Sequence, residues 1–177
     1  MKVGTKSLLF GCHQFILHPI FVTTAWISCY RKLPNPKEFI CIIIHDWGYW
    51  QKPNMDGPEG ELHPQWAAHV ATKYLGGEYG ILCLLHSRFA ARAVMRPVSK
   101  LCLPDKIGVA MMPDWLWVIS AKMTGEVYEY MGQSKYEINK LGPNGKSYRS
   151  PLMFKKAFNR IAKTWRENPS LLNTGGM

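Results

Sequence analysis

The sequence predicts an all-α fold, and three observations support this prediction. Six segments of helical length carry apolar residues every three or four positions, as the buried face of a helix requires. No pair of alternating segments flanks a two-residue turn of the kind that joins paired strands. Proline and glycine separate the six segments, which span residues 19–32, 36–50, 64–75, 79–95, 104–123 and 151–167. A short irregular or hairpin-like stretch is expected at 133–150.

The length and composition are typical of a single globular domain. With 177 residues, 47% hydrophobic and 19% charged, the chain is neither disordered nor collagen-like. Five scattered cysteines favour reduced core thiols over a disulfide framework or a zinc ribbon. No run reaches the ~18 apolar residues of a membrane helix, and the N-terminal stretch lacks a clean signal-peptide cleavage site. We therefore expect a soluble cytoplasmic protein that does not bind membranes.

The first two predicted helices carry polar residues where a core would favour apolar ones. His18 precedes Pro19, and proline is favoured at the first position of a helix, so His18 is expected at the helix start. In the second segment, the apolar run Phe39–Ile44 ends at His45 and Asp46. An ionised carboxylate beside such a run is costly unless it is paired or bound to a cation. The His-Asp pair therefore indicates a metal site.

The next three predicted helices each place one potential ligand on an inward face. His63 shares its helical face with the residues three, four, seven and eleven positions later, which are Trp66, Ala67, Val70 and Tyr74. His86 shares its face with Leu82, Cys83, Phe89 and Ala90, and Asp105 leads the fifth helix after a proline. His69 is expected to face water, and His13 is expected to point elsewhere.

Each of these residues has an ordinary explanation when it is taken alone. A buried histidine is usually a hydrogen-bonded core residue, and an acidic residue after proline is often only a helix cap. The set is harder to explain in this way, because six imidazole and carboxylate ligands can hold two divalent ions such as Mn, Fe, Co, Zn or Mg. The six candidate ligands are His18, His45, Asp46, His63, His86 and Asp105.

The order of these ligands resembles that of the HD superfamily of metal-dependent phosphohydrolases. A histidine is followed by a His-Asp pair, two more histidines and a closing aspartate, and Asp105-Lys106 is similar to the DK that often closes the family pattern. His63-Pro64 resembles the two-metal branch that includes the HD-GYP phosphodiesterases. The chain has His86-Ser87-Arg88 in place of the paired histidines and glutamate of HD-GYP proteins, and it has no GYP triplet. The resemblance therefore does not extend to cyclic-di-GMP as the substrate.

The resemblance covers about residues 10–120 and implies an arrangement of the ligands. His18, His45, Asp46 and Asp105 would hold one ion, and His63 and His86 would hold the second, with Asp46 bridging the two. It also implies a single HD-domain helical bundle over residues 1–125. Residues 126–177 would then be a basic C-terminal helical extension packed on that domain.

The activity implied is hydrolysis of a phosphoester of a nucleotide or a related small anion. Two ions would activate a water as the nucleophile, with Asp46 and Lys106 in the catalytic centre. Substrate contacts are expected from Lys6, Tyr49, Trp50, Lys52 and Arg88, and substrate selection from the loop at 47–56. Arg88 can reach the site only if the helix that contains His86 ends or bends. For these residues, solvated surface or core packing is the alternative.

Two further candidate functions come from other classes, and one of them is a basic nucleic-acid-binding module with a structural metal, for which the tail is the only evidence. A mixed-valent di-iron oxygenase is the second candidate, because myo-inositol oxygenase and the phosphonate-cleaving oxygenases use a similar ligand set on the same scaffold. The net charge is +10, and residues 121–177 contribute more than half of it. The helix at 151–167 carries basic residues beside an apolar stripe, namely Lys155, Lys156, Arg160, Lys163 and Arg166. This pattern predicts a docked helix with a solvated basic face, or a contact with nucleic acid or with a second subunit.

Overall fold

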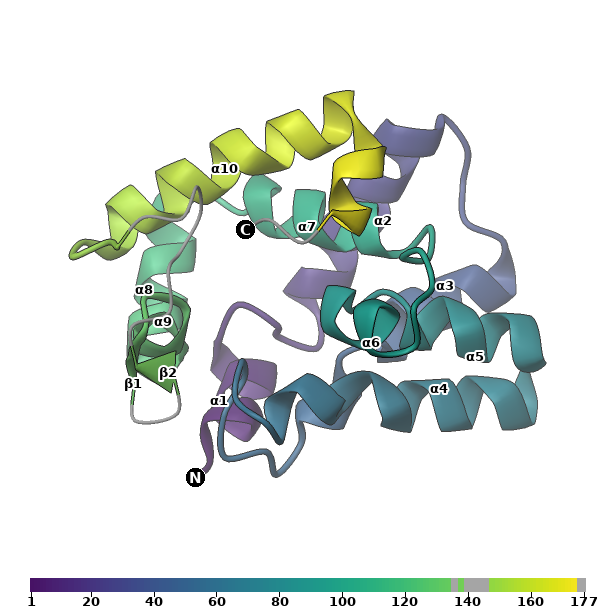
Figure 1. The fold of residues 1–177 in the computed structure, drawn as a ribbon, viewed down its shortest axis with the longest axis horizontal. Helices are drawn as coiled ribbons and strands as arrows, with labels where there is room; N and C mark the ends of the chain where they lie inside the picture. Colours follow the sequence, from purple (N-terminus) through teal and green to yellow (C-terminus); the bar gives the residue numbers. More distant parts are fainter. Residues whose placement is uncertain (135–136, 139–146, 175–177) are drawn as a thin grey trace.

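Helices account for nearly all of the regular structure in the computed structural model, which describes residues 1–134, 137–138 and 147–174 (Figure 1). The helices are α1 (Val3–Phe10), α2 (Leu17–Tyr30), α3 (Pro36–Ile44), α4 (His63–Tyr74), α5 (Gly77–Leu84), α6 (Arg88–Ala93), α7 (Cys102–Met111), α8 (Asp114–Thr124), α9 (Glu126–Tyr130) and α10 (Pro151–Glu167). Short 3₁₀ turns lie at Trp47–Tyr49, Gly60–Leu62 and Pro169–Asn173. The prediction of an all-α fold is confirmed.

Each of the six predicted segments contains a helix, but two of the segments are divided. The segment at 79–95 forms α5 and α6, because the chain leaves the helix before Ser87, whose side chain accepts a hydrogen bond from the Ala90 N–H and caps α6. The segment at 104–123 forms α7 and α8, which are separated by Pro113. Helix α1 was not predicted, because small and polar residues form most of its buried face.

A short antiparallel ladder falls within the stretch that was predicted to be hairpin-like. Strand β1 (Gln133–Ser134) pairs with β2 (Glu137–Ile138), and Gln133 lies opposite Ile138. The remainder of that prediction at 139–146 lies outside the described residues.

Two helix pairs form the frame around the candidate ligands. Helix α2 packs along α7, and α4 packs along α5. Gly108 permits the first contact, because a Cβ atom there would lie 2.9 Å from the backbone nitrogen of Val22. Ala67 and Ala71 are fully buried on α4, whereas Trp66 and Tyr74 are exposed. The prediction that Trp66 and Tyr74 share the inward face of His63 was therefore wrong. His69 is exposed, as predicted.

Helix α10 crosses α7 and α8 and joins the C-terminal segment to the same core (Figure 1). Trp165 and Ala162 of α10 belong to one hydrophobic cluster with Ala25 of α2 and Ile107 of α7. The predicted solvated basic face is present in four residues, Lys156, Arg160, Lys163 and Arg166. The prediction was wrong for Lys155, which is fully buried.

Lys155 is buried because it binds the C-terminal end of α7. Its Nζ donates hydrogen bonds to the carbonyl oxygens of Val109 and Ala110 and to Oδ1 of Asn159. A lysine ammonium suits this position, since the last carbonyls of a helix have no partners within the helix.

The structure bears on two further predictions. All five cysteines are free, as the sequence predicts. Over residues 1–134, 137–138 and 147–174, no helix combines the length and the apolar character needed to span a bilayer.

Candidate metal centre

The six candidate ligands reach one buried point from different parts of the chain. His18 lies in the first turn of α2, and His45 and Asp46 follow the last residue of α3 directly. His63 begins α4, and Asp105 lies in the first turn of α7. The sixth ligand, His86, occupies the break between α5 and α6. All six side chains are buried.

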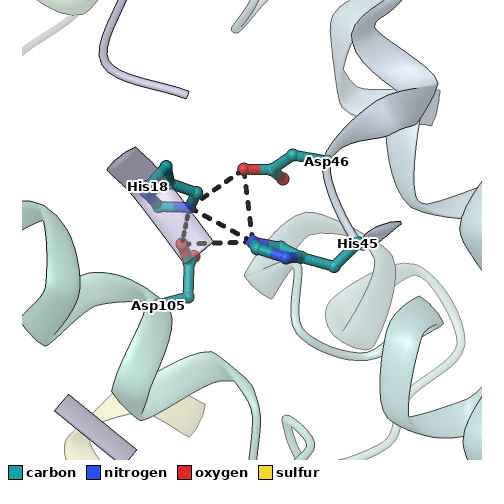
Figure 2. Close-up of side chains that lie close together, drawn as sticks. All are labelled: His18, His45, Asp46 and Asp105. Carbon is teal, nitrogen blue, oxygen red and sulfur yellow. Dashed lines mark hydrogen bonds and ion pairs between the residues drawn. The ribbon is translucent and has the colours of Figure 1, made fainter. Parts of the chain in front are cut away.

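Four of these ligands form the first group (Figure 2), namely His18, His45, Asp46 and Asp105, and their donor atoms lie within 4.8 Å of one another. Nε2 of His18 is 3.2 Å from Oδ2 of Asp46 and 3.1 Å from Oδ1 of Asp105. Nε2 of His45 is 3.2 Å from the same Asp46 oxygen. Four donors at these distances can surround one metal ion.

Asp46, His63 and His86 form the second group, whose donor atoms also lie within 4.8 Å of one another. Oδ1 of Asp46 is 3.4 Å from Nε2 of His63 and 3.3 Å from Nε2 of His86. The two oxygens of Asp46 therefore face different groups, because Oδ2 is directed at His18 and His45. This is the geometry that a bridging carboxylate requires.

Backbone carbonyl groups fix the orientation of three histidine rings. Nδ1 of His45 lies 2.8 Å from the carbonyl oxygen of Ile42, and Nδ1 of His63 lies 2.8 Å from that of Gly60. Nδ1 of His86 faces the carbonyl oxygen of Cys83 in the same way. A carbonyl oxygen only accepts, so each Nδ1 must carry the hydrogen, and a neutral ring then presents the lone pair of Nε2 to the site.

Contacts within the cluster are compatible with a bound cation. Nε2 of His63 and Nε2 of His86 are 3.2 Å apart, and their lone pairs repel each other unless a proton or a metal ion lies between them. Oδ2 of Asp46 is buried and forms no hydrogen bond within the described part of the chain. Burial of the Asp46 and Asp105 carboxylates is costly without a compensating positive charge. The donor set suits a divalent ion.

The pKa values are consistent with this interpretation. Burial lowers the pKa of His63 to about 4, so this ring is neutral and free to act as a ligand. Burial alone would raise the pKa of Asp46, but the charge on His45 and the neighbouring imidazoles outweigh it and hold the pKa well below its usual range. Burial would lower the pKa of His45, but Asp46 and Asp105 raise it to about 10. Without a metal, a proton on His45 supplies part of the positive charge.

A cavity of about 400 Å³ adjoins the cluster, and its lining includes Lys106 and Arg88. Nζ of Lys106 donates to Oδ2 of Asp105 at 2.7 Å. Arg88 reaches the cavity because α5 ends before it. Its guanidinium donates hydrogen bonds to the carbonyl oxygens of Leu172 and Thr174, so Arg88 also binds the C-terminal segment.

Tyr49 lines the cavity too, but it contacts a candidate ligand. Its ring stacks on His63 with 3.9 Å between the ring centroids and an interplanar angle of 15°. Gly48 allows this approach, because a Cβ atom there would collide with the carbonyl oxygen of His63. The ring of Tyr49 therefore supports the ligand on one face.

Three predicted substrate contacts lie outside the lining of this cavity, namely Lys6, Trp50 and Lys52. Trp50 is half exposed and stacks on Phe15, because the turn at 47–49 directs Tyr49 inward and Trp50 outward. Lys52 is fixed by its backbone, since its carbonyl oxygen accepts from the Gly4 N–H. Lys6 lies on α1, whose other middle residues form the buried face. The structure does not bring these three side chains to the candidate ligands.

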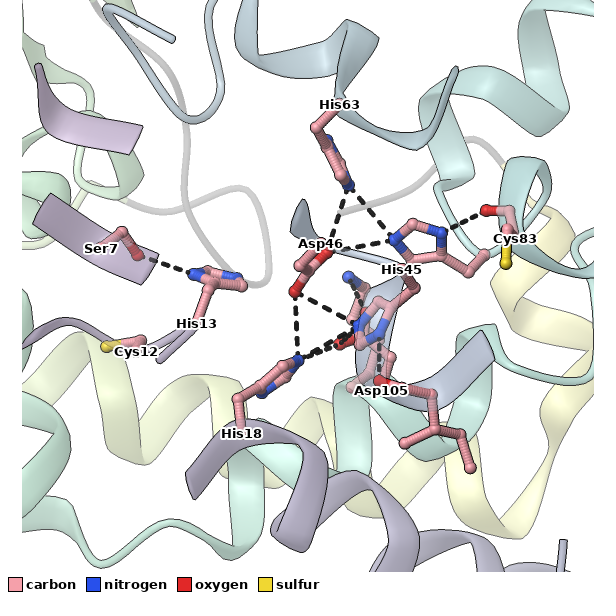
Figure 3. A network of polar contacts seen from close by, with 12 residues as sticks. Ser7, Cys12, His13, His18, His45, Asp46, His63, Cys83 and Asp105 are labelled. Atoms are coloured by element: carbon pink, nitrogen blue, oxygen red, sulfur yellow. Dashed lines mark hydrogen bonds and ion pairs between the residues drawn. The ribbon is translucent and has the colours of Figure 1, made fainter. Parts of the chain in front are cut away.

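Two residues beside the cluster were missed by the sequence analysis, His13 and Glu126. Figure 3 shows His13 to one side of the ligands, and its ring centroid is 5.3 Å from that of His18. Nδ1 of His13 lies 3.3 Å from Glu126, which also accepts from Ser7, the Cys12 N–H, Thr124 and Tyr130. His13 lies in the loop between α1 and α2, where helical spacing gives no signal.

No family model, curated protein or solved structure matches this chain. The assignment of the site therefore rests on its residues and their geometry.

Proposed function

We propose that the chain is a metal-dependent phosphohydrolase of the HD type, and that it hydrolyses a phosphoester of a nucleotide or a related small anion. One observation carries the proposal: the oxygens of Asp46 face two separate groups of imidazole and carboxylate donors. The order of the ligands along the chain, with its resemblance to the HD superfamily, supports the same reaction class.

The charge of the site favours an anionic substrate. Two divalent ions at such a site lower the pKa of a bound water toward ~7 and neutralise negative charge on a phosphoryl group. Asp46 and Asp105 offset only half of the charge of two such ions, so the cavity beside them attracts anions. Three basic residues, Lys106, Arg88 and Arg92, line the same cavity and outnumber its two further carboxylates, Asp56 and Glu61.

The roles of the side chains follow from their positions. Asp46 and Asp105 would supply oxygen ligands, and the four histidines would supply Nε2 donors. Backbone carbonyl groups hold the rings of three of these histidines, His45, His63 and His86. Lys106 is paired with Asp105 and lines the cavity, so its ammonium can contact a phosphoryl oxygen while it holds that carboxylate. We expect Lys106 to bind and orient the phosphate.

The proposal is tested with metal-depleted protein reloaded separately with Mn²⁺, Fe²⁺, Co²⁺, Zn²⁺ and Mg²⁺. Phosphate release from a panel of nucleotides is measured under argon, and oxygen consumption is measured in parallel in air. We expect phosphate release without oxygen for at least one metal. We expect Asp46→Ala to abolish it and His69→Ala, an exposed position on α4, to retain it. Turnover that requires oxygen would contradict hydrolysis and support a di-iron oxygenase.

A further inference from the structure

The lining of the cavity beside the candidate metal centre combines two chemically different groups of residues. The four ligands Asp46, His63, His86 and Asp105 line it together with basic residues. A second group of lining residues is aromatic and comes from α8, α9 and α10, which follow Asp105 in the sequence. These residues are Trp117, Tyr130, Phe154, Phe158 and Trp165. We call these five residues the aromatic wall. The C-terminal part of the chain therefore helps to form the cavity.

Three rings of the aromatic wall, those of Trp117, Tyr130 and Phe154, share nearly one orientation, whereas Phe158 meets Trp165 edge-on at 79°. Phe154 lies at 12° to Trp117 and at 16° to Tyr130, with ring centroids 5.8 Å and 6.2 Å apart. The hydroxyl of Tyr130 donates to Glu126 at 2.9 Å, so this group already has a partner. Near-parallel rings favour a flat aromatic group, which packs against them in offset-stacked or edge-to-face contacts. A sugar hydroxyl would gain less there, because a buried polar group needs hydrogen-bond partners.

We propose that the aromatic wall binds the base of a nucleotide whose phosphate lies at the metal centre. This inference rests on the proposed function and adds where the base is held. The cavity volume of about 400 Å³ lies toward the lower end of the range for small-molecule pockets. It suits one nucleotide and not a polynucleotide. Recognition of the base is thereby assigned to α8–α10, while Tyr49 and Asp56 of the loop at 47–56 also line the cavity.

The inference is tested by equilibrium binding, once to Mn²⁺-loaded protein, whose metal centre can hold the phosphate, and once in the presence of a chelator, where no turnover occurs. Tryptophan fluorescence of the full chain is titrated with each of the four ribonucleoside monophosphates and with ribose 5-phosphate. All five ligands carry a phosphate on ribose, so the ratio of their dissociation constants reports the contribution of the base. Base–aromatic stacking predicts that the best nucleotide binds roughly five- to a hundredfold more tightly than ribose 5-phosphate.

Two conservative variants locate the base. Phe154→Leu and Phe158→Leu keep apolar bulk but remove a ring. Each variant is expected to lower the ratio of the dissociation constant of ribose 5-phosphate to that of the best nucleotide at least about threefold. Phe158 is less buried than Phe154, so its variant keeps the test valid if Phe154→Leu does not fold. Phe39→Leu, at an exposed position on α3 outside the cavity lining, is the matched control and should leave the ratio unchanged.

The outcomes separate this inference from the proposed function. Equal affinities for ribose 5-phosphate and all four nucleotides would overturn the base subsite, as would an unchanged ratio in a folded Phe158→Leu variant. Neither result bears on catalysis, because both are measurements of binding. Failure to release phosphate from any nucleotide with any of the metals would overturn the proposed function, even if the nucleotides bind.

Discussion

Nε2 of His63 and Nε2 of His86 face each other across 3.2 Å, and Nδ1 of each ring is directed at a backbone carbonyl oxygen. A metal ion between the two rings removes the repulsion between their lone pairs. We predict that His86→Ala lowers the metal content of the loaded protein from two ions per chain to one. The first group, His18, His45, Asp46 and Asp105, keeps all of its donors in this variant. Elemental analysis after gel filtration measures the content, and two ions in His86→Ala would count against the second group.

Removal of the metals should destabilise the protein. A ligand that binds only the folded chain stabilises it by about 2.7 kcal/mol when its free concentration is a hundredfold above the dissociation constant. For a chain of this size we expect a chelator to lower the Tm by roughly 5–10 °C. Differential scanning calorimetry with and without EDTA measures the shift. EDTA should cause almost no change in the Tm of Asp46→Ala. A change as large as that of wild type would argue against Asp46 as a ligand.

Glu126 should make stability depend on pH in the acid range. Burial alone would raise the pKa of this carboxyl, but hydrogen bonds from His13, Ser7 and the Cys12 N–H outweigh it and lower the pKa to about 2. The folded pKa is below the ordinary value of 4.5, so the stabilisation is complete above pH 4.5 and is lost as pH falls toward 2. The total is roughly 3 kcal/mol.

Urea unfolding of wild type and Glu126→Gln, from pH 5 down to pH 3, isolates this contribution. The glutamine does not titrate, so the difference in unfolding free energy between the two proteins should shrink as the pH falls. A difference that stays constant over this range would mean that Glu126 has an ordinary pKa in the folded protein.

Lys106 and Lys52 offer a matched comparison of two predicted phosphate contacts. Lys106 lines the cavity and Lys52 does not. A hydrogen bond from a charged donor contributes about 1.5–3 kcal/mol, so Lys106→Gln should lower kcat/KM for phosphate release at least tenfold. Lys52→Gln should remain within about twofold of wild type. Steady-state kinetics on the best nucleotide measure both variants, and the opposite ranking would move the phosphate away from Lys106.

Much of the candidate site was predictable because its residues have local signatures. His18 and His63 each precede a proline that begins a helix, and His45 and Asp46 end an apolar run. Such features depend on neighbours within a few positions, and a single sequence displays them directly. The expectation that Asp46 bridges two ions came from the resemblance, and the orientation of its two oxygens is compatible with it.

Contacts between distant segments could not be predicted from the sequence. His13 meets Glu126, 113 positions away, only because α1 packs against α8 and α9. Lys155 is buried because α10 lies over the end of α7, although its helical position predicts a solvated face. The aromatic wall likewise forms only when α8, α9 and α10 are brought to the cavity.

The metal content of the purified protein tests the central claim most directly. Elemental analysis of wild type and Asp46→Ala, each saturated with Mn²⁺ and then passed through gel filtration, measures how many ions each chain retains. A shared carboxylate predicts two ions per chain in wild type and a loss from both groups in the folded variant. Wild-type protein that retains no metal, or an Asp46→Ala variant that retains two ions, would contradict a dinuclear centre built on this residue.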